Sequence, residues 1–123
     1  MRGLFLCLVV GLVVSSCAAR GPLTLPQSSL AAFQLSAAID DAEQQSYAAG
    51  LYNEAKHLMF DDIVKRILVA ARGYDQAVSG ATDQPVGNAR DTLVLALDDL
   101  EIVIKGVPKL EVAVKALRAL VGS

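Results

Sequence analysis

The sequence predicts an all-α protein, a small three- or four-helix up-and-down bundle that follows a cleaved signal peptide. After residue 28, apolar residues recur every three or four positions, and no segment sustains the polar–apolar alternation of a strand. Hydrophobic residues make up 54% of the 123 residues, yet there are only three Phe, three Tyr and no Trp, so the core must consist of aliphatic side chains and alanine. Clusters of Gly and Pro divide the chain into segments joined by short links, which favour antiparallel helices.

Residues 1–16 have the composition of a secretory signal peptide. A positive start precedes an uncharged run, rich in Leu and Val, from Gly3 to Val14. This run is shorter than the roughly 20 apolar residues that a helix needs to cross a bilayer. We therefore expect the segment to direct export and then to be removed. Two alternatives stay open, namely ordinary cleavage after Ala19 and retention of the segment as an uncleaved anchor.

The residues Val14-Ser15-Ser16-Cys17 resemble the lipobox of bacterial lipoproteins, in which an aliphatic residue and two small residues precede an obligatory cysteine. The resemblance implies that the signal peptidase recognises Val14, Ser15 and Ser16 and cleaves before Cys17. It also implies a covalent lipid on the Cys17 thiol, with no further cofactor, and so a membrane anchor. Ala18 stands where an Asp would be the inner-membrane retention signal of Gram-negative lipoproteins, so the resemblance favours the outer membrane facing the periplasm.

The mature chain divides into a tether and a helical domain. Residues 17–27 contain Gly21, Pro22 and Pro26 without apolar periodicity, which indicates a short tether, and residues 28–123 form the predicted bundle. Removal of Arg2 leaves ten basic against thirteen acidic residues, a net charge of −3 that argues against a nucleic-acid partner. In composition and layout the domain resembles small helical lipoproteins, some of them encoded by phages or prophages.

The first helix is expected to begin within residues 24–29, where a Thr and a Gln have the spacing of a capping box, and to end near Ala49. Its larger apolar residues predict the buried stripe Leu30, Phe33, Ala37 and Tyr47. The polar run at residues 40–45, Glu43 included, predicts that the second half of this helix is largely exposed to solvent.

The second helix has the clearest apolar periodicity and is predicted to be the central one. Apolar residues recur at spacings of three and four from Leu51 to Val78. The stripe consists of Leu51, Ala55, Leu58, Met59, Ile63, Ile67, Ala70, Tyr74 and Val78, widened by Phe60, Val64, Leu68 and Ala71. Its polar residues, His57 among them, are expected to face water.

Residues 79–87, a cluster of Gly, Asp and Pro, predict the main loop. A third helix is expected from Asn88 to Lys105 and a fourth from Pro108 to Val121, because Pro suits the first turn of a helix. The predicted inward residues are Ala89, Leu93, Ala96, Leu97, Leu100, Val103 and Ile104, then Leu110, Ala113, Leu117 and Leu120. The excess of acidic residues before Lys105 and of basic residues after it predicts that these two helices are neighbours with complementary rims.

Glu54 and His57 have the Glu-x-x-His spacing that places two metal ligands on one helix face, and Asp61 follows one turn later. These three residues are the candidate metal ligands of the sequence. A di-metal site of this kind needs a second His, and the chain has a single one, so the site would have to form by oligomerisation. The other interpretation of the same residues is a solvent-exposed helix surface.

The sequence contains no nucleophile elbow and no phosphate-binding loop, and its one mature cysteine is the lipidation site, so we do not expect an enzyme. The expected function is that of a membrane-anchored, non-enzymatic helical lipoprotein that acts as an envelope protein-binding or accessory module. Its partner would be an envelope protein or a second copy of the chain. The alternative is a carboxylate and histidine metal-binding bundle formed by oligomerisation.

Overall fold

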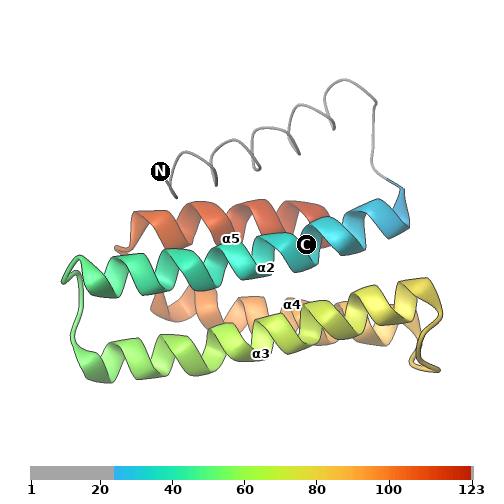
Figure 1. The fold of residues 1–123 in the computed structure, drawn as a ribbon, viewed down its shortest axis with the longest axis horizontal. Helices are drawn as coiled ribbons and strands as arrows, with labels where there is room; N and C mark the ends of the chain where they lie inside the picture. The colour runs from blue at the N-terminus through green and yellow to red at the C-terminus, as the bar shows by residue number, and fades with distance from the viewer. Residues whose placement is uncertain (1–23, 123) are drawn as a thin grey trace.

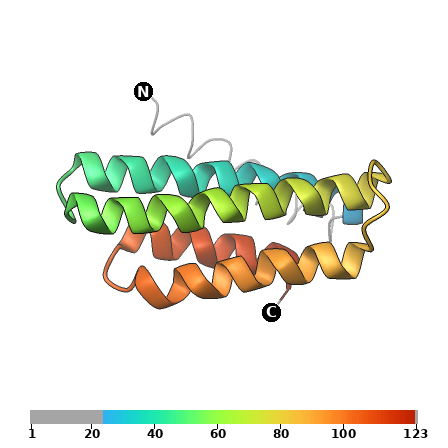
Figure 2. The same cartoon turned by 90° about the horizontal axis from the view of Figure 1, so that it is seen from below.

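The computed structural model describes residues 24–122, and within this range the chain forms four helices and no strand. They are α2 (Leu25–Ala48), α3 (Glu54–Ser79), α4 (Val86–Val103) and α5 (Pro108–Val121). Each helix runs antiparallel to the next, and α5 returns to pack on α2, so the four helices form a closed ring (Figures 1 and 2). The predicted up-and-down bundle is confirmed, with four helices. The predicted signal peptide, the predicted lipobox and most of the predicted tether lie outside the described residues.

The bundle has two ends with different contents. The near end holds the start of α2, the loop at residues 80–85 and the last turn of α5. The far end holds the two shorter connections, residues 49–53 and 104–107. Figure 1 shows the two ends on opposite sides of the picture, with α2 entering at the near end. The described chain therefore begins at the near end of the bundle.

Local chemistry sets the helix boundaries. Thr24 and Gln27 form the predicted capping box, in which each side chain bonds the backbone N–H of the other residue. The Asn53 side chain accepts from the Lys56 N–H at 2.9 Å and caps α3. At its other end α3 stops at Gly80, whose φ of 78° lies in the left-handed region that glycine adopts without steric cost. The predicted bounds of the last helix, Pro108 and Val121, are confirmed.

The buried face of α2 differs from the predicted one. Leu30 is 49% exposed, Ala37 is exposed, and Phe33 and Tyr47 are only half-buried. The most deeply buried residues of α2, each at 0 or 1% exposure, follow one another at alternating spacings of three and four residues. They are Ser29, Ala32, Ser36, Ile39, Glu43 and Ser46. Five of these six residues are small or polar, so a search for large apolar residues selects the wrong face. The predicted exposure of Glu43 is therefore also wrong.

The other three helices supply the large core side chains. The largest fully buried ones on them are Phe60, Ile67, Leu93, Leu97, Leu100, Leu110 and Leu117. The predicted stripe of α3 is correct in its middle and wrong at its start, where Leu58 and Met59 are 59% and 41% exposed and Leu51 lies in the preceding loop. On α5, Val114 is buried while the predicted Ala113 is half-buried. The core therefore resembles that of an aliphatic helix bundle, as the composition predicts.

The predicted complementary rims are confirmed between α4 and α5. Arg118 on α5 donates to Glu101 at 2.6 Å and to Asp98 at 2.5 Å. These hydrogen bonds, to Glu101 first and then to Asp98, raise the pKa of the Arg118 guanidinium. These ion pairs thus hold α5 against α4. Among the described helices, none combines the length and the apolar composition that a membrane crossing requires.

Candidate functional site

The three candidate metal ligands do not come together. The His57 Nδ1 atom lies 2.7 Å from the Glu43 Oε2 atom on α2, and Asp61 pairs with Lys65 at 2.9 Å. Glu54 is exposed in the first turn of α3. Across residues 24–122, no group of three or more His, Cys, Asp or Glu side chains is arranged to hold a metal ion. The lipidation candidate Cys17 and the residues 14–16 before it lie outside the described part of the chain.

The partner that His57 takes instead is a completely buried carboxylate. Glu43 has 0% exposure, and its Oε2 atom is contacted by His57 and by the Tyr52 hydroxyl at 2.7 Å. The Tyr52 hydroxyl also lies 2.8 Å from the Glu43 backbone carbonyl. The other carboxylate oxygen, Oε1, and the nearby Ser46 hydroxyl are buried without a hydrogen-bond partner. Glu43, Tyr52 and His57 form what we call the buried triad.

Aromatic rings enclose the buried triad. The Tyr47 ring stacks on the His57 ring with a centroid separation of 3.9 Å and an interplanar angle of 3°. The Phe60 ring meets Tyr52 edge-on at 4.8 Å and 85°. Burial and the Glu43 carboxylate raise the pKa of Tyr52 above its ordinary value. The phenol therefore keeps its proton at neutral pH and can donate a hydrogen bond to Glu43.

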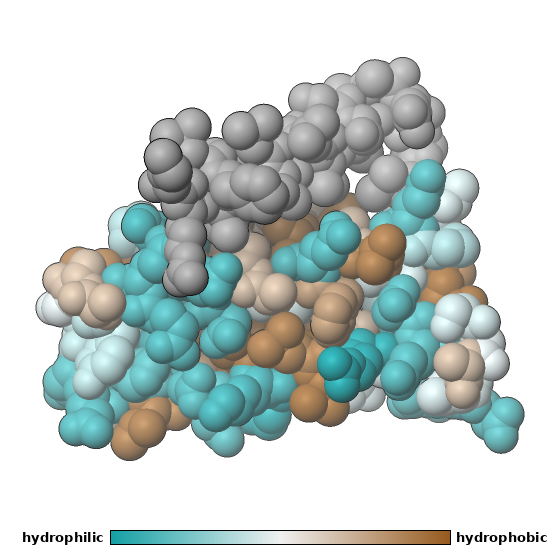
Figure 3. Space-filling view, viewed as in Figure 1, coloured by the Kyte–Doolittle hydropathy of each residue, from teal (hydrophilic) through white to brown (hydrophobic). Residues whose placement is uncertain are grey.

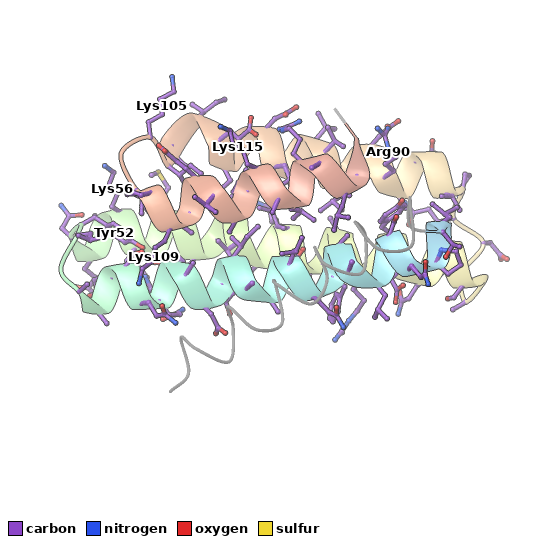
Figure 4. All side chains as sticks on the ribbon, turned by 90° about the horizontal axis from the view of Figure 1, so that it is seen from above. Tyr52, Lys56, Arg90, Lys105, Lys109 and Lys115 are labelled. Carbon is purple, nitrogen blue, oxygen red and sulfur yellow. The ribbon has the colours of Figure 1, made fainter. Side chains whose placement is uncertain are left out.

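The buried triad connects three segments at the far end of the bundle. Glu43 belongs to the last turns of α2, Tyr52 to the connection, and His57 to the first turns of α3. In Figure 4, Tyr52 lies at the same end as Lys56, Lys105 and Lys109, opposite Arg90. Burying a charge is costly unless it is paired and hydrogen-bonded, so these contacts fix the angle between α2 and α3. The buried triad therefore acts as a non-covalent cross-link between α2, the connection and α3.

A second feature lies on the outside of α3 and α4, the side that Figure 2 views from the front. A shallow groove of about 510 Å³ runs between these two helices. It is lined by Asp62, Lys65, Arg66, Val69, Ala70, Thr92, Leu95, Ala96 and Asp99. The Arg66 Nη1 atom and the Asp99 Oδ2 atom are 3.3 Å apart and bridge the two helices. We call the groove and the exposed residues beside it the α3–α4 face.

The α3–α4 face exposes large apolar side chains. Val69 is 73% exposed, Leu95 is 65% exposed, and Ile102, seven residues after Leu95, is 72% exposed. Residues seven apart lie on the same side of a helix, so Leu95 and Ile102 form one apolar row beside the groove. Apolar residues gathered between charged ones on a protein surface are typical of a site for another protein. The sequence prediction missed all three, because they stand outside the stripes that fill the core.

The neighbouring face, formed by α2 and α3, is better covered. Figure 3 views this face and shows hydrophobic residues in its middle with hydrophilic residues around them. Across it, the Arg72 guanidinium carbon lies 5.9 Å from the centre of the Phe33 ring, a cation–π contact that covers the ring. On this face the Phe33 ring of α2 has a partner within the chain. The α3–α4 face has a hollow instead.

No protein-family model matches the chain, and no curated protein or solved structure is similar to it. The function must therefore be argued from the chain itself. The described residues offer two features for this purpose. The side chains of the buried triad bond to one another, whereas the α3–α4 face is open to solvent.

Proposed function

We propose that the chain is a lipid-anchored, non-enzymatic protein-binding module of the bacterial envelope, and that the α3–α4 face is its binding surface. The observation that carries this proposal is the apolar groove between α3 and α4, with Val69 and Leu95 exposed beside it. A groove between two antiparallel helices accepts an amphipathic helix, whose apolar residues fill the hollow while its polar residues meet the charged edges. The expected partner is thus a helical protein segment.

The anchor that we propose on Cys17 gives this surface a defined position. Thr24 is the seventh residue after Cys17, and an extended chain spans at most about 3.6 Å per residue, so the near end lies within roughly 25 Å of the lipid. The bundle then projects away from the outer membrane into the periplasm. The groove runs along the bundle, so it stays open to a periplasmic partner, and the buried triad lies at the end away from the lipid.

Metabolic labelling with a fatty-acid analogue tests the anchor. Wild-type chain should carry the label, and the Cys17→Ser variant should lose it because serine cannot form the thioether. Cys7→Ser is the matched control, since this cysteine lies within the predicted signal peptide and should not change the labelling. Equal labelling of the wild type and Cys17→Ser would remove the anchor from the proposal.

A photo-crosslinking amino acid at position 95 tests the binding surface in living cells. Leu95 is 65% exposed on the α3–α4 face, and Leu51, 59% exposed in the far-end connection, provides a control position of the same residue type. We expect a discrete protein adduct from position 95 and none of that size from position 51. Equal adducts from both positions would show that the face has no special role in binding.

Elemental analysis of the purified protein tests the alternative, a metal-binding bundle. Nothing in the placement of Glu54, His57 and Asp61 favours that function, because His57 is bonded to Glu43 and Asp61 to Lys65. Stoichiometric metal that disappears in His57→Ala would establish it in spite of this geometry. A metal content equal in wild type and variant would not support it.

A further inference from the structure

Four lysines of the described chain have no ion-pair partner, whereas the other lysine and arginine side chains are engaged. The engaged ones, four in ion pairs and one on the Phe33 ring, are Lys65, Arg66, Arg90, Arg118 and Arg72. The four without such a partner within residues 24–122 are exposed, and they are Lys56, Lys105, Lys109 and Lys115. Three of these four lie on α5 or in the connection that leads to it. The chain therefore leaves the lysines of α5 free to contact another molecule.

The outer side of α5 carries two of these lysines around an exposed apolar residue. Lys109, Val112 and Lys115 follow one another at a spacing of three, so they lie about 60° apart around the helix and form one strip. Val112 is 70% exposed. The buried residues of α5 lie on the opposite side, and they are Leu110, Val114, Leu117 and Val121. Glu111, the one acidic residue of α5, accepts the Gly106 N–H at 2.9 Å. We call Lys109, Val112 and Lys115 the α5 strip.

Charge is distributed unequally between α5 and the helices around it. Residues 104–122 contain four basic residues and one acidic residue, whereas α4 contains one basic and four acidic residues. On α2, Asp40 lies seven residues after Phe33 and so on the same side of the helix, the side that meets Arg72 of α3. Asp41 is the exposed carboxylate that α2 contributes to its outer side. In the described bundle, the unpaired lysines therefore outnumber the carboxylates on the side that α2 and α5 form.

This α2–α5 side lies opposite the α3–α4 face in the ring of helices. Figure 2 views the bundle from below, where α3 and α4 are in front, and Figure 4 views it from above, where α2 and α5 are in front. In Figure 4, Lys105 and Lys109 stand at the far-end start of α5 and Lys115 farther along it. The α5 strip and the proposed protein-binding face therefore lie on opposite sides of the bundle.

We propose that the α5 strip contacts the anionic phospholipid headgroups of the membrane in which the chain is anchored, an inference that rests on the lipid anchor proposed at Cys17. The Val112 side chain enters between the headgroups. Lys109 and Lys115 lay their aliphatic stems along the apolar boundary and place their ammonium groups on lipid phosphates. A convex helix surface with an apolar residue between lysines suits a flat, deformable partner, which a lipid surface is.

The part of the chain before residue 24 is long enough for this position. Thr24 precedes α2, one of the two helices on the side that meets the membrane. A helix is about 10 Å in diameter, so in a bundle that lies on this side Thr24 is within about 10 Å of the headgroups. An extended tether from Cys17 spans roughly 25 Å, which is more than this distance. The bundle can thus exchange its projecting position for one along the membrane surface.

The lying position leaves the proposed protein-binding face accessible and sets its direction. The α3–α4 face then points away from the membrane, toward a periplasmic partner. Most carboxylates of the described chain are also held away from the anionic surface, since α3 and α4 carry four each of the thirteen acidic residues. The membrane contact therefore orients the binding face.

We expect the contact to be weak alone and effective in an anchored chain. One lysine near an anionic surface strengthens membrane binding about fivefold, so Lys109 and Lys115 together contribute about 25-fold. The proposed anchor keeps the strip close to the surface and so raises its effective concentration there. The attraction should disappear in about 1 M NaCl, because the Debye length falls to about 3 Å.

A polarity-sensitive dye at position 112 tests the contact in reconstituted vesicles. Cys7 lies in the predicted signal peptide and Cys17 would carry lipid, so the variant Val112→Cys supplies the free thiol of the mature lipidated chain. Val69→Cys is the matched control, since Val69 is 73% exposed on α3 and Val112 is 70% exposed on α5. In vesicles of phosphatidylcholine with phosphatidylglycerol, the emission from position 112 should shift to the blue and that from position 69 should stay unchanged. No shift at position 112, an equal shift at both positions, or the same shift in phosphatidylcholine alone overturns the proposal.

Removal of charge from the α5 strip tests the role of its lysines. In the chain labelled at position 112, Lys109→Gln with Lys115→Gln should lower the ratio of lying to projecting chains about 25-fold. Lys65→Gln is the control, because Lys65 is exposed on α3 and should leave the ratio unchanged. Circular dichroism confirms that the variants keep the helix content of the parent. An unchanged ratio in the double variant overturns the assignment to the α5 strip.

Photo-crosslinking from position 112 in living cells separates lipid from protein as the occupant. A lipid adduct supports the proposal. A discrete protein adduct, together with no dye shift in vesicles, overturns the lipid contact and assigns the α5 strip to a protein.

Failure of the anchor is seen separately, as the absence of fatty-acid label from the wild-type chain. The dye comparison is then made with chains that also carry Cys7→Ser and Cys17→Ser, added to the same vesicles from solution. A blue shift at position 112 but not at position 69 would still support the contact, and its absence would overturn it. Crosslinking from position 95 reports on the α3–α4 face alone, so the proposed protein-binding function stands or falls independently.

Discussion

Replacing His57 by Phe removes the nitrogen that contacts the buried Glu43 and keeps a flat ring against Tyr47. In the native chain Glu43 has no exposure, and its Oε2 atom is bonded to His57 and Tyr52. The variant leaves the carboxylate with Tyr52 alone and with an Oε1 atom that has no partner. Breaking a buried pair by removing one member costs about 3–5 kcal/mol. We expect about 3 kcal/mol, the lower end of that range, because the imidazole is 16% exposed and Tyr52 still donates.

Thermal and urea unfolding, followed by circular dichroism, measure this loss. A cost of about 3 kcal/mol lowers the midpoint of a domain of this size by roughly 12–24 °C. The double variant Glu43→Leu with His57→Phe removes the buried charge together with its partner, and it should recover most of the loss. The free energies of unfolding of His57→Phe and of the double variant should therefore differ clearly. A difference below about 0.5 kcal/mol would mean that Glu43 is not left with an uncompensated charge in His57→Phe, and it would refute the expected role of His57.

Three further predictions concern stability. Folding raises the pKa of Tyr52, so the protonated phenol stabilises the folded state. This stabilisation is complete below the ordinary tyrosine pKa of about 10 and is lost as the pH rises toward the folded-state pKa. The thermal unfolding midpoint of wild type should therefore fall more steeply with pH above about 10 than that of Tyr52→Phe. Leu97→Ala, at 0% exposure, should cost about 2–5 kcal/mol in urea unfolding. The control Leu95→Ala, at 65% exposure on the same helix, should stay within about 0.5 kcal/mol of wild type. Thr24→Ala removes the capping box and should cost about 1 kcal/mol, with faster hydrogen exchange at the Gln27 amide, and unchanged exchange there would contradict the cap.

Local signals in the sequence were sufficient for the helices and their order. Pro108 and Gly122 delimit α5, and the Thr and Gln of the capping box start α2, because each acts on its own helix end without help from distant residues. The all-helical bundle follows from this punctuation together with the apolar periodicity. The start of α3 was placed too early, since Leu51 continues the apolar spacing but precedes the Asn53 cap. The third helix, predicted from Asn88 to Lys105, was placed two residues too late at both ends, because α4 spans Val86–Val103.

The buried face of α2 could not be found from its large apolar residues, and with it the buried triad was missed. Glu43 is charged, and what permits its burial is a His 14 residues away and a Tyr nine residues away, brought together only by the turn between α2 and α3. One signal was present, the alternating spacing of three and four from Ser29 to Ser46, which is that of a helix seam. The α3–α4 face was missed for a different reason, since an exposed Val or Leu has no meaning until its neighbours in space are known.

The ring of helices has a consequence for how the protein is made. Helix α2 packs on both α3 and α5, so its burial is complete only when α5 is in place. Helix α5 begins at Pro108, 60 residues after α2 ends at Ala48. A chain that emerges from the ribosome with its N-terminus first therefore holds an unfinished fold until α5 has emerged as well. Loss of α5 would leave a permanently open and aggregation-prone intermediate.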